Sequence, residues 1–271
     1  MPKINFESKE ARQWALDVTK YWIENFDIDG WRMDVAKELD FSFWKEFRDV
    51  AHGANKDTLL ISEIFGDTSQ WLQGDRFDGT MNYSFRESMT DYFATKRITN
   101  KEFADSLANL YSMYSFEALS SCQNLLSSHD VKRFLNRCGN EKDGMLGAIF
   151  LQATFPGIAG IYYGDEIGLG GADDPFNREP FPWDNQQSWN FEILNYLKEL
   201  MKIKRESPIF KYGRFELLNE HNDFVAFRRI LKDESMLCVI NREKSNDDFQ
   251  IISNAHSINS VSYTHLRAHE T

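Results

Sequence analysis

The chain has 271 residues, of which 42% are hydrophobic and 27% charged, and its formal net charge at pH 7 is −11. This composition is typical of a folded globular protein with a sizeable core, and it excludes a disordered or fibrous chain. The negative charge argues against a nucleic acid or an anionic membrane as partner, and no apolar run reaches the roughly 18 residues that span a bilayer. The three cysteines show no Cys-x-x-Cys spacing, so the sequence predicts neither a disulfide framework nor a metal clamp.

Alternating helix and strand patterns run through the first three quarters of the chain. Ala11, Trp14, Val18 and Trp22 recur at helical spacing, which predicts an amphipathic first helix. The alternation predicts βαβ units and a parallel sheet, although the strands are too few to close an eight-stranded barrel. In chain order the predicted helices are 8–25, 40–53, 84–96, 101–114, 131–137, 141–153 and 187–206, and the predicted strands are 26–35, 58–64, 79–83, 120–127 and 158–163.

The pattern changes after the last of these helices. Short alternating runs at 214–218, 223–231, 235–241 and 247–252 predict antiparallel strands of a separate β domain. Between strand 158–163 and helix 187–206, a long stretch rich in Gly, Pro and Asp predicts a functional loop. The final residues continue no pattern and are interpreted as a non-native tail, so the spacing of His265 and His269 is not taken as a metal site.

Three acidic residues follow three separate apolar runs: Asp34, Glu63 and Asp130. A carboxyl group where a buried strand ends is costly to desolvate, so it rarely occurs there without a partner or a function. In a β/α barrel, catalytic groups collect at the carboxyl ends of the strands. The three acids therefore predict a carboxylate-based active site.

Cleavage of a glycosidic bond with retention needs one ionised and one protonated carboxyl group. Asp34 suits the ionised role, because Arg32 shares its face of the strand and favours its charge. Glu63 follows Leu-Leu-Ile-Ser, and such an apolar setting raises a carboxyl pKa. His129 and Asp130 add a neutral donor and a third carboxylate that suit sugar hydroxyls.

Each signal also has a structural interpretation. Arg-x-Asp on a strand is more often a plain ion pair, and Glu63 is also placed to cap the following turn. Asp130 is placed to cap a helix that runs into Val131. The order of the acids and their shared place at strand ends favour the catalytic interpretation.

Seven segments of the chain match known patterns, and they are Gly30-Trp-Arg-Met-Asp34, Ser62-Glu63-Ile-Phe-Gly-Asp67, Ser128-His129-Asp130, Ile161-Tyr-Tyr-Gly-Asp-Glu-Ile167, Met1-Pro-Lys-Ile-Asn5, Trp71-Leu-Gln-Gly-Asp75 and Met81-Asn-Tyr-Ser-Phe85. The first four resemble segments of the α-amylase family of glycoside hydrolases. The last three are similar to its subfamily of neopullulanases, cyclomaltodextrinases and maltogenic amylases. One departure is Lys37 in Val35-Ala-Lys-Glu38, where the subfamily commonly has asparagine, which affects the expected acceptor preference.

The resemblance implies roles for individual residues. Asp34 would be the nucleophile, Glu63 the general acid/base and Asp130 the stabiliser of the transition state. Asp165 and Glu166 would brace the barrel mouth, and a plain turn is the alternative for the loop that holds Asp174. The residues implied as substrate contacts are Arg32, Lys37, Glu38, His129, Asp174, Asn177 and Arg178.

The predicted fold class is α/β, a partial (β/α)8 TIM barrel of strands four to eight followed by an incomplete antiparallel β domain. Residues 1–206 would form the barrel part, 207–260 the truncated β domain and 261–271 the tail. The implied activity is retaining hydrolysis of α-1,4-glucosidic bonds in cyclodextrins, pullulan, starch or maltooligosaccharides, with this truncated chain expected to be inactive. The alternatives are a non-catalytic carbohydrate-binding or assembly module, and an α-1,6-glucosidase or transglycosylase.

The resemblance places the first three strands and the inserted domain upstream of Met1. Calcium is possible in the intact protein, but its ligands would come from that upstream part, so this chain predicts no cofactor and no metal. An α-glucan or maltooligosaccharide is the expected ligand, and the intact protein is expected to form a homodimer. The first residues lack the apolar segment of a signal peptide, which favours the cytoplasm and leaves the localisation open.

Overall fold

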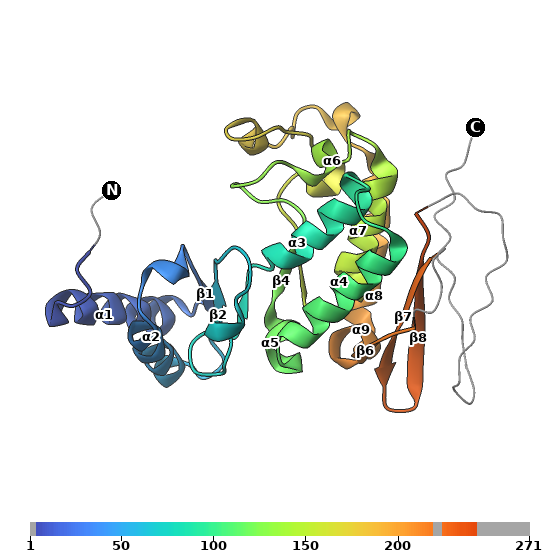
Figure 1. Cartoon of the computed structure of the whole chain (residues 1–271). Helices are drawn as coiled ribbons and strands as arrows, with labels where there is room; N and C mark the ends of the chain where they lie inside the picture. Colours follow the sequence, from blue (N-terminus) through green and yellow to red (C-terminus); the bar gives the residue numbers. More distant parts are fainter. Residues whose placement is uncertain (1–3, 219–223, 243–271) are drawn as a thin grey trace. The chain divides into compact units, whose positions relative to one another are not determined.

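The structure is a computed structural model that describes residues 4–218 and 224–242 (Figure 1). The described residues divide into two compact units, the first within residues 4–84 and 113–123 and the second within residues 85–112, 124–218 and 224–242. Among the described residues, no helix combines the length and the apolar character that crossing a membrane requires.

The first unit begins with two helices that pack against each other, α1 (Lys9–Phe26) and α2 (Phe41–Ala54). Ser8 caps α1 by accepting a hydrogen bond from the Ala11 amide at 3.3 Å, and Asp40 caps α2 in the same way. The predicted helix is confirmed, but the predicted apolar face is wrong. Leu16 and Ile23 are buried, whereas Trp14 is 58% exposed and Trp22 is exposed too.

The first unit contains a parallel three-stranded sheet. It consists of β1 (Gly30–Met33), β2 (Leu59–Ser62) and β3 (Gly79–Thr80) in that order. Met33 pairs with Ser62 at the last position of both strands. The residues that follow, Asp34 and Glu63, therefore leave the sheet at the same edge, as the sequence predicted. The unit also contains α5 (Phe116–Ser121) and the 3-10 helices Ala36–Glu38 and Ser69–Trp71.

The second unit is mainly helical and carries the small antiparallel sheet. Helix α7 is buried along most of its length and packs against α8. Strand β7 pairs with both β6 and β8, which confirms the predicted antiparallel strands among the described residues. The helices are α3 (Tyr83–Met89), which crosses from the first unit, the π-helix Thr90–Ala94, α4 (Asn100–Met113), α6 (Phe134–Arg137), α7 (Lys142–Thr154), the 3-10 helices Asp165–Ile167, Phe176–Arg178 and Gln186–Ser188, α8 (Phe191–Glu206) and α9 (Pro208–Tyr212), and the strands are β4 (Gln123–Leu125), β5 (Ile158–Gly160), β6 (Arg214–Leu217), β7 (Val225–Leu231) and β8 (Glu234–Ile240).

Several element boundaries differ from the prediction for local reasons. The predicted strand 120–127 begins only after α5, and the predicted helix 187–206 begins at Phe191 because the Asn190 side chain caps it. Helix α9 was not predicted, and Pro208 starts it at its first position, where a missing N–H costs no helical hydrogen bond. The predicted strand 247–252 and the tail lie outside the described residues.

Two cations contact the carboxyl end of α7, the fully buried Arg229 of β7 and the partly buried Lys204 of α8. The Arg229 guanidinium donates to the Thr154 carbonyl at 2.6 Å, and the Lys204 ammonium donates to the Ala153 carbonyl at 3.0 Å. Both acceptors are carbonyl oxygens at the carboxyl end of α7, where a helix favours positive charge. Burial lowers the pKa of Lys204 to about 7 and that of Arg229 to about 10.

Candidate active site

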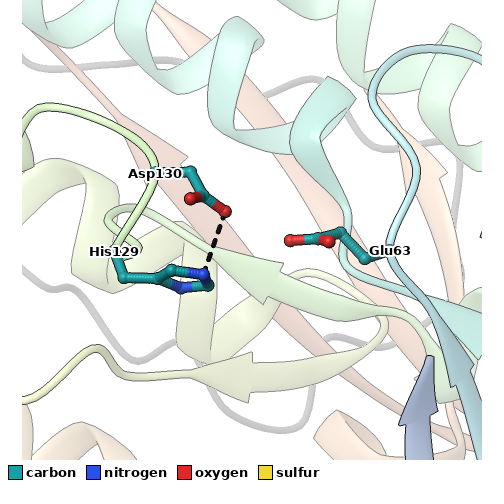
Figure 2. Close-up of side chains that lie close together, drawn as sticks. All are labelled: Glu63, His129 and Asp130. Atoms are coloured by element: carbon teal, nitrogen blue, oxygen red, sulfur yellow. Dashed lines mark ion pairs between the residues drawn. The ribbon is translucent and has the colours of Figure 1, made fainter. Parts of the chain in front are cut away.

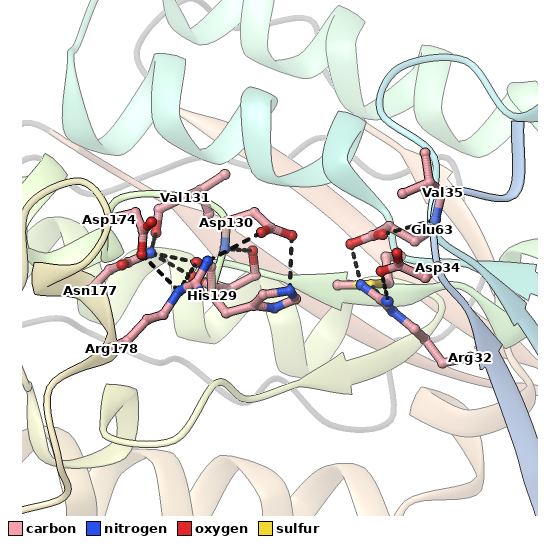
Figure 3. Close-up of polar contacts among 12 residues, drawn as sticks. Arg32, Asp34, Val35, Glu63, His129, Asp130, Val131, Asp174, Asn177 and Arg178 are labelled. Carbon is pink, nitrogen blue, oxygen red and sulfur yellow. Dashed lines mark hydrogen bonds and ion pairs between the residues drawn. The ribbon is translucent and has the colours of Figure 1, made fainter. Parts of the chain in front are cut away.

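Arg32 bridges the two acids of the first unit (Figure 3). Its Nη1 donates to Asp34 Oδ1 at 2.6 Å, and its Nη2 forms an ion pair with Glu63 Oε1. The contact with Asp34 follows from their i, i+2 spacing on one strand, as predicted. The contact with Glu63 was not predicted, because it depends on the register between β1 and β2.

The two acids have opposite environments. The side chain of Asp34 is 73% exposed, whereas Glu63 is 4% exposed as a residue. Burial raises the pKa of Glu63 above its ordinary value, and the neighbouring Asp34 adds to this effect. The Val35 N–H, which donates to Glu63 Oε2 at 3.2 Å, and the charge of Arg32 act in the opposite direction. The raised pKa agrees with the sequence prediction for Glu63.

Val35 adopts a left-handed conformation with φ 43° and ψ 47° directly after Asp34. This region is strongly disfavoured for a β-branched residue, so the surrounding structure must hold it. The next residue supplies that support: the Ala36 N–H donates to the Glu63 carbonyl, and the Ala36 carbonyl accepts from the Trp44 indole at 2.8 Å. The strained turn directs the Val35 amide at the buried carboxylate.

Lys37 and Glu38 are exposed on the short 3-10 helix that follows this turn. A substrate contact by either side chain stays a prediction.

The second unit holds the other polar group, His129 and Asp130, in the loop after β4. His129 Nε2 lies 3.1 Å from Asp130 Oδ2 (Figure 2), and both side chains are partly exposed. Helix α6 begins only at Phe134, whose N–H donates to Ser127 Oγ at 2.9 Å. The capping interpretation of Asp130 is therefore wrong, and its carboxylate lies beside His129 and Arg178 instead.

The 3-10 helix Phe176–Arg178 contacts this loop (Figure 3). Asn177 is fully buried, and its Nδ2 donates to the carbonyl oxygens of His129 at 2.9 Å and Val131 at 3.0 Å. Arg178 Nε donates to the His129 carbonyl at 2.9 Å, and Arg178 also pairs with Asp174. The side-chain amide of Asn177 thus contacts the protein backbone, which the sequence did not predict. Asp174 and Arg178, the other two predicted substrate contacts of this loop, are exposed.

Arg133, which follows the loop of His129 and Asp130 in the chain, forms a buried pair with Asp165. Arg133 Nη1 donates to the Tyr163 carbonyl at 2.7 Å, and its guanidinium stacks on the rings of Tyr162 and Tyr163. It lies 3.4 Å from Asp165 Oδ1. Burial raises the pKa of Asp165 to about 7, since desolvation outweighs the effect of the arginine. The sequence singled out Asp165 but gave no sign of its partner Arg133.

Residues 1–207 match the model of the family described as the α-amylase catalytic domain. The chain belongs to the α-amylase family. It is 37% identical over 247 residues to a cyclomaltodextrinase of Thermoanaerobacter pseudethanolicus, which covers 91% of this chain and 43% of the relative. It is 38% identical to neopullulanase 2 of Thermoactinomyces vulgaris, over 89% of this chain and 41% of that protein.

Solved structures give the same result. A cyclomaltodextrinase structure superposes with a TM-score of 0.84 at 34% identity, and the match covers 89% of this chain and 42% of that one. The cyclic α-maltosyl-(1→6)-maltose hydrolase of Arthrobacter globiformis also gives a TM-score of 0.84, at 33% identity over 88% of this chain and 53% of its own. The chain thus spans less than half the length of the relatives named first. Its α/β fold with parallel strands is that of part of an amylase catalytic domain.

Proposed function

We propose that the acids of this chain carry out retaining hydrolysis of α-1,4-glucosidic bonds in cyclodextrins, pullulan, starch or maltooligosaccharides. The observation that carries the proposal is the Arg32 bridge between Asp34, which is exposed, and Glu63, which is buried with a raised pKa. Two carboxyl groups whose environments separate their pKa values can act as base and acid at one pH. The family membership supports the same chemistry.

In the first step, the Asp34 carboxylate attacks the anomeric carbon while the Glu63 carboxyl group protonates the leaving glycosidic oxygen. The C–O bond breaks, and a glycosyl ester forms on Asp34. In the second step, the Glu63 carboxylate removes a proton from water, which attacks the same carbon and releases Asp34. Arg32 stabilises Asp34 as a carboxylate when it leaves.

The supporting roles follow the resemblance. Asp130 is the third acid, which stabilises the transition state, and His129 donates a hydrogen bond to the sugar. Lys37 and Glu38 would contact the acceptor side of the substrate. Asp174 and Arg178, in the loop between β5 and α8, would contact another sugar unit. We further propose that the parallel strands are strands four to eight of a barrel, with 1–206 as barrel and 207–260 as the β domain.

The first two relatives are more than twice as long as the matched part of this chain. We propose that turnover requires the remaining length of such a protein and that residues 1–271 alone do not turn over substrate. Missing strands would leave unpaired edges in a parallel sheet. A purified 271-residue chain that hydrolyses β-cyclodextrin, at a rate abolished by Asp34→Asn, would contradict this part of the proposal.

The activity itself is tested on the complete protein that carries this chain. β-Cyclodextrin and maltotriose are supplied as substrates, and the anomeric configuration of the first products is read by proton NMR before mutarotation. We expect products of the α configuration. Products of the β configuration would show inversion and would exclude Asp34 as a nucleophile.

A second candidate is cleavage of α-1,6 bonds. It is favoured by the similarity to two solved structures, the cyclic α-maltosyl-(1→6)-maltose hydrolase and a debranching enzyme from Nostoc punctiforme, each with a TM-score of 0.84. Panose contains one bond of each type and separates the two candidates. Release of glucose and isomaltose indicates α-1,4 cleavage, whereas maltose and glucose indicate α-1,6 cleavage.

A further inference from the structure

The loop of residues 128–131 has little internal support. The Asp130 N–H donates to Ser128 Oγ at 3.2 Å, and the Val131 N–H donates weakly to the Ser128 carbonyl at 3.4 Å. These bonds leave the carbonyl oxygens of His129 and Val131 to be satisfied from elsewhere. Backbone carbonyl oxygens are strong acceptors, so the group that supplies their donors also fixes the path of the loop.

Asn177 supplies them. Its fully buried Nδ2 lies 2.9 Å from the His129 carbonyl, 3.0 Å from the Val131 carbonyl and 3.4 Å from the Ser128 carbonyl. The three acceptors come from both sides of Asp130. One amide group therefore connects the two ends of the segment that carries the proposed third acid.

Arg178 adds a second, weaker connection. Its Nε donates to the His129 carbonyl at 2.9 Å, and its Nη2 lies 3.7 Å from Asp130 Oδ1. The arginine side chain is 47% exposed, and ion pairs at such positions contribute little. We expect Asn177 to have the larger effect.

The 3-10 helix that carries Asn177 is itself firmly placed. A Cβ atom at Gly171 would lie 2.6 Å from the Phe176 carbonyl oxygen and 2.9 Å from Asn177 Cα, so only glycine fits there. The Gly171 carbonyl accepts from the Arg133 N–H at 3.2 Å. The backbone of Asn177 is therefore packed against a segment that is hydrogen-bonded to Arg133, two residues after the loop.

We propose that Asn177, assisted by Arg178, is the positioning residue that orients His129 and Asp130 through their backbone. This inference rests on the proposed function, because it takes Asp130 as the acid that stabilises the transition state. Asn177 needs no contact with substrate to act in this way. Its loss would let the loop relax, and displacement of a catalytic group by about 1 Å can cost about 100-fold in rate.

The decisive experiment is a double-mutant cycle in the complete protein that carries this chain, with Asn177→Ala and Asp130→Asn made singly and together. We expect Asn177→Ala to lower kcat about 10- to 100-fold with little change in KM. In the Asp130→Asn background, the same change should lower kcat by less than about threefold, because the group that it positions is already lost.

Asn124→Ala is the matched control. Asn124 is also a fully buried asparagine of the second unit, and its Nδ2 donates to the Pro156 carbonyl at 2.9 Å, away from the loop. This variant should lose thermal stability but keep its kcat when the rate is expressed per folded molecule. An equal loss of kcat in both variants would overturn the positioning role, since any buried amide would then be equivalent.

Two further outcomes are distinguishable. If Asp130→Asn keeps full activity, the proposed function of Asp130 fails; if it loses activity but Asn177→Ala lowers kcat equally in both backgrounds, only the positioning role fails. Should Asn177→Ala not fold, Asn177→Ser, which keeps a polar group at the same position, replaces it in the same cycle, with a smaller expected loss of about 3- to 10-fold. Additive effects of Asn177→Ser and Asp130→Asn would equally overturn the proposal.

Discussion

Asp34 and Glu63 directly follow two paired strands and share one arginine, whereas His129 and Asp130 lie in a loop whose carbonyl oxygens are held by a distant side chain. In the first group, backbone pairing fixes the positions, and charge and burial decide the chemistry. In the second group, hydrogen bonds to the backbone decide the positions themselves. The same kind of residue, an acid after a strand, is thus supported in two different ways.

The largest effects are expected from the two acids of the first group. Asp34→Asn should lower kcat at least about 10³-fold with every substrate, because no ester can form. For Glu63→Gln we expect a similar loss of kcat/KM, which reports the first step, with maltotriose. With α-maltosyl fluoride the loss of kcat/KM should be much smaller, since fluoride leaves without a proton. The values of kcat/KM for both substrates test this, and equal losses for Glu63→Gln would contradict the acid role.

Arg32→Ala should lower kcat about 100-fold, because the bridge between the two acids is lost. Arg32 lowers the pKa of Glu63, so its removal raises that pKa further, and the alkaline limb of the pH profile of kcat/KM should move to higher pH. Arg32→Lys keeps the positive charge but loses the guanidinium group that contacts both acids, so it should shift the alkaline limb of the pH profile less. If the alkaline limb has the same midpoint in Arg32→Ala as in the unchanged protein, Glu63 is not the group whose pKa determines that limb.

The Arg133–Asp165 pair predicts a pH dependence of stability. The pKa of Asp165 is raised from 3.8 to about 7 in the folded state, so between these values the folded protein holds a proton that the unfolded chain has lost. Stability from this group is therefore full below about pH 4 and decreases as the pH rises towards 7. Asp165→Asn should flatten the decrease of Tm over this range, and an unchanged slope would refute the assignment.

The smallest effect is expected from Lys37→Asn. Lys37 is exposed on the 3-10 helix after Asp34, so its replacement should leave the hydrolysis rate nearly unchanged. The ratio of transfer products to hydrolysis products with maltotriose should change by less than about 10-fold, because only acceptor binding differs. Lys56→Asn, an exposed lysine of the same unit, serves as the control. Identical product ratios in all three proteins would remove Lys37 from the acceptor site.

The two regions also differ in how much the sequence predicted. The place of Asp34 and Glu63 after two parallel strands was predicted, since apolar runs and the i, i+2 spacing of Arg32 are local signals. The raised pKa of Glu63 followed from the same run. The Arg32–Glu63 ion pair was not predicted, because it depends on strand register, which no single segment encodes.

For the second group, the residues could be named from the sequence, but their arrangement could not be predicted. Asn177 and Arg178 lie more than 40 residues after His129, and no periodicity connects them. The prediction that α6 starts near Val131 failed because residues 128–131 bond to the later loop instead. The partner of Asp165 was missed for the same reason, since a buried Arg133 looks like any surface cation in the sequence.

The central claim is that Asp34 is the nucleophile and Glu63 its acid and base. It is tested most directly by incubating Glu63→Gln in the complete protein with α-maltosyl fluoride and analysing its peptides by mass spectrometry. Fluoride can leave unaided, but water then lacks its general base, so the ester should accumulate. We predict one added maltosyl group on the peptide that contains Asp34, and none in Asp34→Asn. A maltosyl group on another residue, or rapid turnover with no label in either variant, would contradict the account.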